Sequence, residues 1–216
     1  MARRPPAARA DLARHLAAVG RRFDARNWVL GTSGNFSAVR SRRPLRLVIT
    51  ASAVHKGTLT PSAFLDVDET GNVRGRRSRH PSAETRIHLA IVKSRGDEAG
   101  AVLHTHSVWG TILSDLHAES GGLAIEGFEM LKGLEGVTTH EHREWVPIVE
   151  NDQDMEALAG RITGVLDRDR DARVHGILLR AHGLYTWGRT IADAERHVEI
   201  LEFLLEAIGR RSQPWR

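Results

Sequence analysis

The chain has 216 residues, of which 41% are hydrophobic and 27% charged, and a formal net charge of +4. This balance is ordinary for a globular protein and excludes a fibrous or disordered chain. The absence of cysteine excludes disulfides, thiolate nucleophiles and cysteine-ligated metal centres, and it is typical of a reducing cytoplasm.

No apolar run reaches the roughly 18 residues that a membrane-crossing helix requires, and the basic N-terminus lacks the apolar stretch of a signal peptide. We therefore predict a cytoplasmic protein without a membrane partner. It is expected to form one domain over residues 1–216, with a flexible leader over residues 1–8. Only 5% of residues are aromatic and no nucleic-acid-binding motif is visible, so the basic charge is expected to favour anionic metabolites and not nucleic acid.

Hydrophobic periodicity predicts helices and strands interspersed along the whole chain. In chain order these are a helix over residues 8–27, strands over 36–39 and 45–50, a strand pair over 64–67 and 72–76, a helix over 81–94 with Ser82 as N-cap, a strand over 101–106, a helix over 108–116, a strand over 145–149, a helix over 152–167, strands over 174–180 and 184–187, and a helix over 190–208. This pattern favours a mixed, largely antiparallel sheet covered by helices.

Two histidines separated by one residue, His104 and His106, follow the apolar run of residues 101–103. Residues two apart on a strand point to the same face, so both imidazoles are predicted to project together, as a metal chelate requires. His182 is the strongest candidate for a third ligand, because it follows a predicted buried strand and precedes Gly183, which permits a sharp turn and a close approach of the backbone. Three histidines leave one coordination position open, which is typical of a catalytic zinc, although imidazoles alone do not select zinc over iron, manganese or cobalt.

Other interpretations of the histidines remain open. Most isolated pairs of this kind are ordinary hydrogen-bonded residues. With a carboxylate, His104 and His106 would form the facial triad of an iron oxygenase, but that predicts a barrel of short strands, which the long helices oppose. Of the remaining histidines, His15, His88 and His197 are expected on helix surfaces or interfaces, His140 and His142 in a solvated loop, and His55, His80, His117 and His175 without an identified partner.

Small polar residues and glycines mark a candidate anion site. The loop GTSGN at residues 31–35 can present backbone N–H groups to a phosphate, but it lacks the ending of a Walker loop and also suits a plain connection. Ser82 at a helix start can add a hydroxyl and the positive end of a helix dipole, or it caps the helix. Ser52 and Lys56, which follow the strand at residues 45–50, are further candidates.

Two glutamates are candidates for moving protons in carbonyl chemistry. Glu129 lies in the otherwise apolar segment FEML, and apolar surroundings raise the pKa of a carboxylate toward neutrality, which suits general acid/base catalysis. Glu84 follows the Pro-Ser pair at residues 81–82. For each glutamate, a solvated helix carboxylate or a salt-bridge partner is the alternative interpretation.

Seven segments together resemble the class II aldolase family. They span most of the chain in the family's order, which is more specific than any single motif. The segments are GTSGNFS (31–37), ITASAVHKGTLTP (49–61), HPSAETRIH (80–88), AVLHTHS (101–107), FEMLKG (128–133), VPIVEN (146–151) and RAHGLYTWG (180–188).

The resemblance implies a three-layer α/β/α fold with a central mixed, largely antiparallel sheet. It implies a homotetramer with active sites near subunit interfaces, a phosphorylated ketose as substrate, and one Zn²⁺ per subunit on His104, His106 and His182. It places the phosphate around Thr32, Gly34, Asn35, Ser52 and Ser82, with Lys56 as a further candidate.

Branches of the family use different carboxylates. In the dehydratase branch the acid/base group lies in the motif matched by FEMLKG, which implies Glu129. In the sugar-phosphate aldolases of fuculose or rhamnulose phosphate type it is the glutamate after the Pro-Ser motif, here Glu84. FEMLKG and RAHGLYTWG favour a zinc-dependent dehydration in methionine salvage, with aldol cleavage or pentulose-phosphate epimerisation as the alternatives.

Two positions depart from the family pattern. Ala53 stands where the family commonly has glycine, and its Cβ can crowd a phosphate bound by the backbone. Ala83 stands where a second serine is frequent. Both departures concern phosphate contacts and not the metal. Some relatives of this fold are structural proteins that lack the metal histidines, so the presence of all three favours an enzyme.

Overall fold

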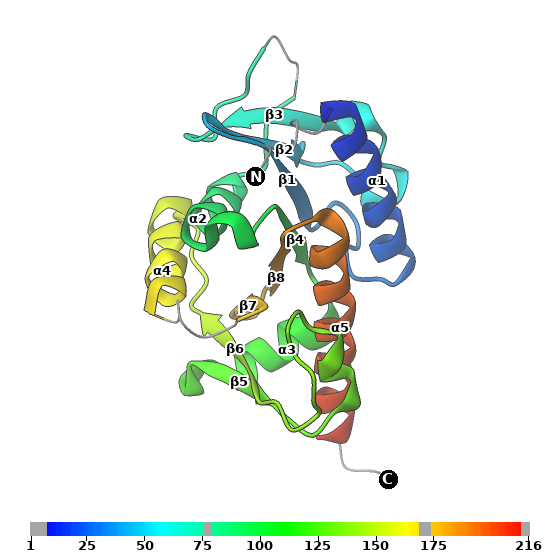
Figure 1. The fold of residues 1–216 in the computed structure, drawn as a ribbon, viewed down its shortest axis with the longest axis vertical. Helices are drawn as coiled ribbons and strands as arrows, with labels where there is room; N and C mark the ends of the chain where they lie inside the picture. The colour runs from blue at the N-terminus through cyan, green and yellow to red at the C-terminus, as the bar shows by residue number, and fades with distance from the viewer. Residues whose placement is uncertain (1–7, 76–78, 169–173, 213–216) are drawn as a thin grey trace.

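An eight-stranded sheet forms the centre of the computed structural model, which describes residues 8–75, 79–168 and 174–212 (Figure 1). The strands lie in the order β3-β2-β1-β4-β8-β7-β6-β5. Neighbouring strands are antiparallel except for β6 and β7, which are parallel and joined through a helix, as a parallel connection requires. The prediction of a mixed, largely antiparallel sheet is therefore confirmed. The strands are β1 (Asn35–Arg42), β2 (Leu45–Thr50), β3 (Phe64–Asp68), β4 (Ala101–Thr105), β5 (Gly122–Ile125), β6 (Glu144–Val149), β7 (Gly176–Leu179) and β8 (Gly183–Gly188).

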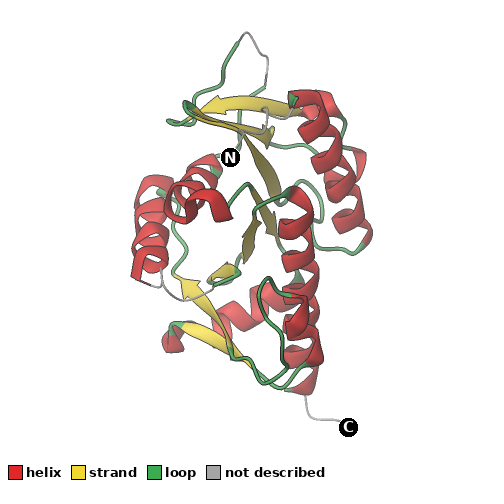
Figure 2. Ribbon diagram, in the orientation of Figure 1, coloured by secondary structure: helices red, strands yellow, loops and turns green. Residues whose placement is uncertain are grey.

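Within the described part of the chain, five α-helices cover the two faces of this sheet (Figure 2). α2 and α4 pack on one face, and α1, α3 and α5 pack on the other. The predicted three-layer α/β/α architecture is therefore confirmed. The helices are α1 (Arg9–Ala25), α2 (Thr85–Arg95), α3 (Val108–Leu116), α4 (Met155–Arg168) and α5 (Ile191–Arg211).

The helices form where apolar residues recur at helical spacing, and in α5 a capping residue also starts the first turn. In α1, Leu16, Val19 and Phe23 are fully buried against the sheet. α5 begins with a capping box, in which Thr190 and Asp193 satisfy each other's backbone N–H groups. Burial on one face explains why the sequence predicted both helices closely, and the capping box marks the start of α5.

The prediction differs from the structure in three places. Residues 72–75 form no strand, because Val73 makes only an isolated bridge to Val67, and Arg76 lies outside the described residues. α2 begins at Thr85 and not at residue 81, because Pro81 is still extended and bridges Ala51. The short edge strand β5 was not predicted, since its four residues carry too little periodicity to be recognised. Residues 1–7 of the predicted leader also lie outside the described residues.

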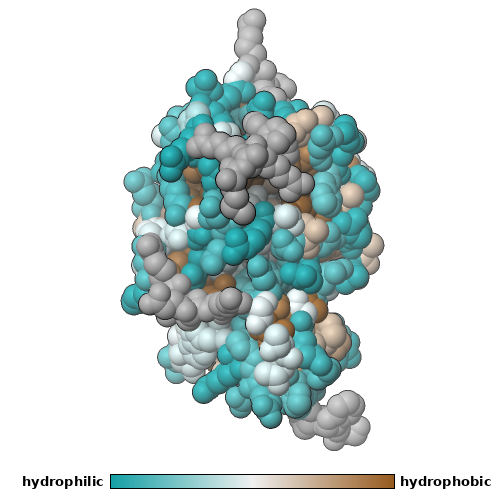
Figure 3. Space-filling view, in the orientation of Figure 1, coloured by the Kyte–Doolittle hydropathy of each residue, from teal (hydrophilic) through white to brown (hydrophobic). Residues whose placement is uncertain are grey.

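The visible surface in Figure 3 is largely hydrophilic, with hydrophobic atoms in small patches. On α3, Val108, Ile112 and Leu116 are four residues apart and are 63%, 42% and 69% exposed, so they form an apolar stripe along one side of the helix. None of the described helices is long and apolar enough to cross a bilayer.

Candidate active site

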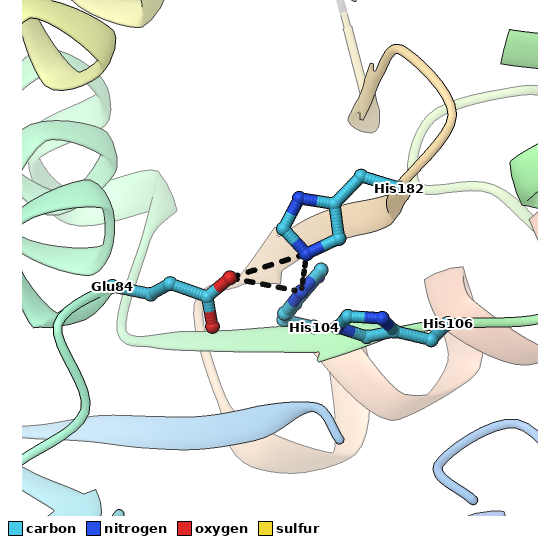
Figure 4. A group of neighbouring side chains, drawn as sticks. All are labelled: Glu84, His104, His106 and His182. Carbon is cyan, nitrogen blue, oxygen red and sulfur yellow. Dashed lines mark hydrogen bonds and ion pairs between the residues drawn. The ribbon is translucent and has the colours of Figure 1, made fainter. Parts of the chain in front are cut away.

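Four side chains from three distant segments meet at one end of the central strands (Figure 4). His104 lies on β4 and His106 directly follows it, while His182 lies in the turn between β7 and β8. Glu84 is the N-cap residue of α2. The ring centroids of His104 and His106 are 4.4 Å apart, and those of His106 and His182 are 4.5 Å apart. The structure therefore brings the three predicted histidines together and adds Glu84.

The separations between the four groups fit a metal ion. Their ligand atoms all lie within 4.8 Å of one another. His104 Nε2 is 3.3 Å from His182 Nε2, and Glu84 Oε1 is 3.2 Å from His182 Nε2. A tetrahedral zinc with bonds of about 2.0–2.1 Å holds its ligand atoms roughly 3.4 Å apart. The cluster can therefore hold a metal ion, and its imidazole and carboxylate donors suit zinc as well as iron, manganese or cobalt.

The sheet fixes the orientation of His104. Its Nδ1 donates to Leu184 O at 3.0 Å, which leaves Nε2 free to bind a metal. Its ring stacks on Tyr185, the residue paired with it on β8, with centroids 3.8 Å apart. Behind the same strand, Thr105 donates a hydrogen bond to Glu202, a carboxylate on α5 that is only 2% exposed.

Glycine is required where the turn carrying His182 meets β4. A Cβ on Gly183 would lie 2.0 Å from Thr105 O, a distance that real Cβ atoms do not reach. The absence of a side chain therefore lets the turn approach β4 closely enough for His182 to meet His104. This is the role that the sequence analysis assigned to Gly183.

Burial keeps two of the site's imidazoles neutral. It lowers the pKa of His104 well below its ordinary value and lowers the pKa of His106 to about 4. Glu84 opposes both shifts, but burial outweighs it. A neutral imidazole has a free lone pair, so these two residues need not lose a proton to bind a metal near pH 7.

Glu84 places a negative charge beside these histidines. Burial acts to raise its pKa, but the interactions with His182, led by a hydrogen bond, and the hydrogen bond from Asn35 lower it more strongly. The pKa of Glu84 therefore lies below its ordinary value, and the carboxylate is ionised at neutral pH. An ionised carboxylate accepts hydrogen bonds only and is also a good metal ligand.

The loops of the candidate phosphate site lie next to one another. Lys56 is buried, and its Nζ donates to Thr32 O and Val54 O, both at 2.7 Å, so it ties the loop at residues 31–35 to its own loop. Ser52 N donates to His80 O at 2.9 Å, which brings Ser52 beside the segment that carries Ser82. Contact of these side chains with phosphate stays a prediction.

Backbone conformation explains two of the small residues in these loops. Gly34 has a φ of +73°, and a Cβ there would lie 2.7 Å from His104 O. Ala53 has a φ of +55°, a value that favours glycine. Ala53, which stands where the family commonly has glycine, therefore adopts a backbone conformation that glycine would adopt without strain. Asn35 Nδ2 lies 3.4 Å from Ser82 Oγ, so these two predicted contacts are neighbours.

Glu129 does not join the four clustered residues. It lies in the 3-10 helix Glu129–Gly133 with its side chain 68% exposed, and it pairs with Lys132. The hydrogen bond with Lys132 lowers the pKa of Glu129, so the predicted raised pKa is wrong. The reason is that Leu131 is buried but its neighbour Met130 is 38% exposed, so apolar neighbours in the sequence do not surround the carboxylate.

Three histidines outside the site are buried: His88 and His197, which were expected on helix surfaces or interfaces, and His175, for which no partner had been identified. His88 is fully buried on α2 and bonds to Ser37, and its pKa is lowered to about 4 by burial. His175 bonds Glu144 at 2.9 Å, and His197 donates to a backbone carbonyl of β8. The signal missed for His88 was its place between Ile87 and Leu89, since a polar residue inside an apolar run of a helix is often buried and paired.

The family to which this chain belongs follows from comparison with known sequences. A sequence model described as Class II Aldolase and Adducin N-terminal domain matches residues 14–208. The chain therefore belongs to this family.

Individual relatives are similar over most of the chain. Methylthioribulose-1-phosphate dehydratase of Methylococcus capsulatus is 46% identical over 194 residues, which cover 90% of this chain and 91% of the relative. The protein of the same name from Xanthomonas campestris pv. campestris is 44% identical over 178 residues, covering 82% and 79%. Among solved structures, YgbL from Escherichia coli superposes with a TM-score of 0.76 at 24% identity, covering 96% and 93%, and so shares the fold.

Proposed function

We propose that this chain is a zinc-dependent hydro-lyase of methionine salvage that acts in the cytoplasm. It converts 5-methylthioribulose 1-phosphate to 2,3-diketo-5-methylthiopentyl 1-phosphate and water. One observation carries the choice of reaction, namely that relatives 46% and 44% identical over most of the chain are named methylthioribulose-1-phosphate dehydratase. The convergence of three histidines and a carboxylate supports a metal-assisted reaction at a ketone.

His104, His106 and His182 would hold the ion. When bound, zinc supplies a Lewis acid that polarises the substrate ketone and stabilises negative charge on its oxygen. Glu84, which lies 3.6 Å from His104 Nε2, adds a negative charge that strengthens cation binding and helps to orient the site.

The chain's own residues bind the substrate and move its protons. A proton leaves the carbon next to the ketone, and the hydroxyl on the following carbon leaves as water, so that an enol forms and rearranges to the diketone. We assign the proton transfer to Glu129, which accepts the proton from carbon and returns one to the departing hydroxyl. The phosphate end is held by donors in the three adjoining loops, which fixes the reacting carbons at the site. These donors are Thr32, Gly34, Asn35, Ser52 and Ser82, with Lys56 holding the loops in place.

A homotetramer would explain how Glu129 reaches a metal site. In the single chain its carboxylate faces solvent and pairs with Lys132. The exposed stripe of Val108, Ile112 and Leu116 lies on α3, which directly follows His106. Packing of a second subunit over this stripe would bury apolar area next to the site. We therefore propose that Glu129 of one subunit serves the histidines of another.

Product analysis tests the reaction. The zinc-loaded chain is incubated with synthetic 5-methylthioribulose 1-phosphate, and the products are identified by mass spectrometry. Loss of one water to give the diketone is expected, and His182→Ala should abolish it because one ligand is removed. Formation of carbon–carbon cleavage fragments without water loss would contradict the proposal.

Mixing of inactive variants tests the shared site. Glu129→Gln keeps the histidines, and His182→Ala keeps Glu129, so each homotetramer should be inactive. If Glu129 acts across the interface, mixed tetramers made by dissociation and reassembly should recover up to roughly a quarter of wild-type activity, because random assembly pairs intact halves in that proportion. No recovery in tetramers shown to be mixed would place Glu129 in its own subunit's site or outside catalysis.

Aldol cleavage is the second candidate, and the position of Glu84 favours it. The carboxylate that meets the histidines is Glu84, which occupies the position of the aldolase acid/base group. If this reaction dominates, L-fuculose 1-phosphate or L-rhamnulose 1-phosphate should be cleaved, and Glu84→Gln should stop cleavage while Glu129→Gln does not. Full dehydratase activity in Glu129→Gln would likewise remove Glu129 from the mechanism.

A further inference from the structure

A chain of buried polar side chains leads from β1 through α2 to the metal cluster. His88 on α2 and Ser37 on β1 are both 0% exposed, and His88 Nδ1 lies 2.7 Å from Ser37 Oγ. The other ring nitrogen, Nε2, bonds Asn35 Oδ1, and Asn35 Nδ2 bonds Glu84 Oε2. Glu84 uses its second oxygen, Oε1, to face the histidine cluster.

The chemistry of these groups fixes the direction of every hydrogen bond. Asn35 presents its amide nitrogen to Glu84 Oε2, and an amide nitrogen can only donate. The amide oxygen of Asn35 therefore faces His88, whose Nε2 must carry the proton. Burial lowers the pKa of His88 to about 4, so its ring is neutral and its Nδ1 accepts from the Ser37 hydroxyl.

We propose that His88 is a positioning residue that acts through Asn35 to aim the Glu84 carboxylate at the metal histidines. The N–H of His88 prevents the Asn35 amide from turning over. A turned amide would place its oxygen against Glu84, and the two acceptors would repel each other and move the carboxylate away from the ion.

The backbone supports the same arrangement. Glu84 is the N-cap residue of α2, and His88 N donates to Glu84 O at 3.3 Å, so the two residues lie one turn apart on the same side of the helix. Asn35 is paired with His104 across β1 and β4. A single amide therefore links the helix that carries Glu84 to the strand that carries a metal ligand.

A double-mutant cycle tests this role with a readout independent of catalysis. Binding of Co²⁺ is measured by competition with a chelator, and kcat is measured in parallel, for His88→Leu, Asn35→Ala and the double variant. Each single change should weaken Co²⁺ binding and lower kcat by roughly tenfold to a hundredfold, as loss of supporting bonds behind metal ligands does. The double variant should lose no more than Asn35→Ala alone, because His88 acts only through Asn35.

Two further variants separate positioning from folding. His88→Gln places an amide N–H near the former Nε2 and should restore Co²⁺ affinity and kcat toward wild type. Ile91→Ala removes a fully buried side chain from the same helix without touching the hydrogen-bond chain, so it should lower stability but not Co²⁺ affinity.

Additive losses in the double variant would overturn the proposal, and so would an equal loss of Co²⁺ affinity in Ile91→Ala. The kcat readout rests on the proposed function, but the Co²⁺ readout does not. A wild-type chain that binds Co²⁺ and fails to dehydrate the substrate would refute the proposed reaction while leaving the cycle interpretable.

Discussion

A buried carboxylate lies directly behind the strand that carries the candidate metal ligands. Glu202 on α5 is 2% exposed and accepts a hydrogen bond from Thr105. Burial raises its pKa from an ordinary value of 4.5 to about 7, and the hydrogen bonds from Ser107 and Thr105 oppose the shift without cancelling it. Near neutral pH this group therefore titrates in the folded chain, whereas in the unfolded chain it is already ionised.

The sign and size of the effect follow from linkage. Because the folded pKa lies above the unfolded one, the folded chain holds this proton more tightly, and stability falls as pH rises from about 4.5 through about 7. At roughly 1.4 kcal/mol per pKa unit, this shift lowers the free energy of unfolding by about 3 kcal/mol between the acidic and the basic end of this pH range. Ionised Glu202 thus destabilises the chain above neutrality.

The substitution Glu202→Gln removes the titration and keeps the size of the side chain. We expect the variant to match wild type near pH 4.5 and to be more stable by about 3 kcal/mol at pH 8.5. Urea unfolding of metal-free protein at both pH values, at one fixed concentration, measures the difference. Other titrating groups are common to both chains and cancel in the comparison.

A matched control comes from the same helix. Glu199 pairs with Arg26 at 3.0 Å and both side chains are well exposed, so Glu199→Gln should change stability by no more than about 1 kcal/mol at either pH. If wild type and Glu202→Gln show parallel stability over this range, Glu202 does not titrate there and the burial argument is refuted.

Three further outcomes are expected. Gly183→Ala should lower the free energy of unfolding by about 1–3 kcal/mol, measured by urea unfolding, because its Cβ would meet Thr105 O at 2.0 Å. The same variant should bind less zinc by elemental analysis. The control Gly164→Ala, on α4 with open space around it, should raise the free energy of unfolding by about 0.5–1 kcal/mol. Burial acts to lower the pKa of His175, but the Glu144 carboxylate outweighs burial and raises this pKa. The ion pair between His175 and Glu144 therefore stabilises the fold below pH 6.5, and this stabilisation is lost as pH rises through the raised pKa. Glu144→Gln should therefore cost about 3 kcal/mol at pH 6 and less at pH 8.5 by thermal unfolding, and an equal cost at both would contradict the ion pair. A chelator should lower the unfolding midpoint of the zinc-loaded chain, and added zinc should restore it, unless no ion is bound.

Local rules predicted the parts of this chain in which sequence neighbours decide the structure. The two-residue period of a strand correctly placed His104 and His106 side by side, and helical spacing located α1 and α5 within a few residues. His182 is 78 residues from His104, so no periodic pattern places it there; its position after a predicted buried strand made it a candidate, and the resemblance to a family implied the same residue. Gly183 gave the physical hint, because a turn without a side chain can approach a neighbouring strand.

Burial of polar groups was hard to predict from the sequence, and the apolar run around His88 was a signal for it that was missed. Glu129 has apolar neighbours but is exposed, because a 3-10 helix on the surface turns successive residues in different directions. His88 and Glu202 were overlooked for the opposite reason, since a polar residue on a helix is usually solvated, and only the packing of α2 and α5 against the sheet buries these two. The burial of such residues can be predicted once the strand or helix that packs against them is known.

The stacking of His104 on Tyr185 has a practical consequence for spectroscopy. Tyr185 is the only tyrosine in the chain, and its ring centroid lies 3.8 Å from that of His104. In protein grown with ring-labelled tyrosine, every aromatic signal of the label therefore arises beside the candidate ion. Titration of such a sample with zinc would report occupancy directly, without a mutation or an attached dye.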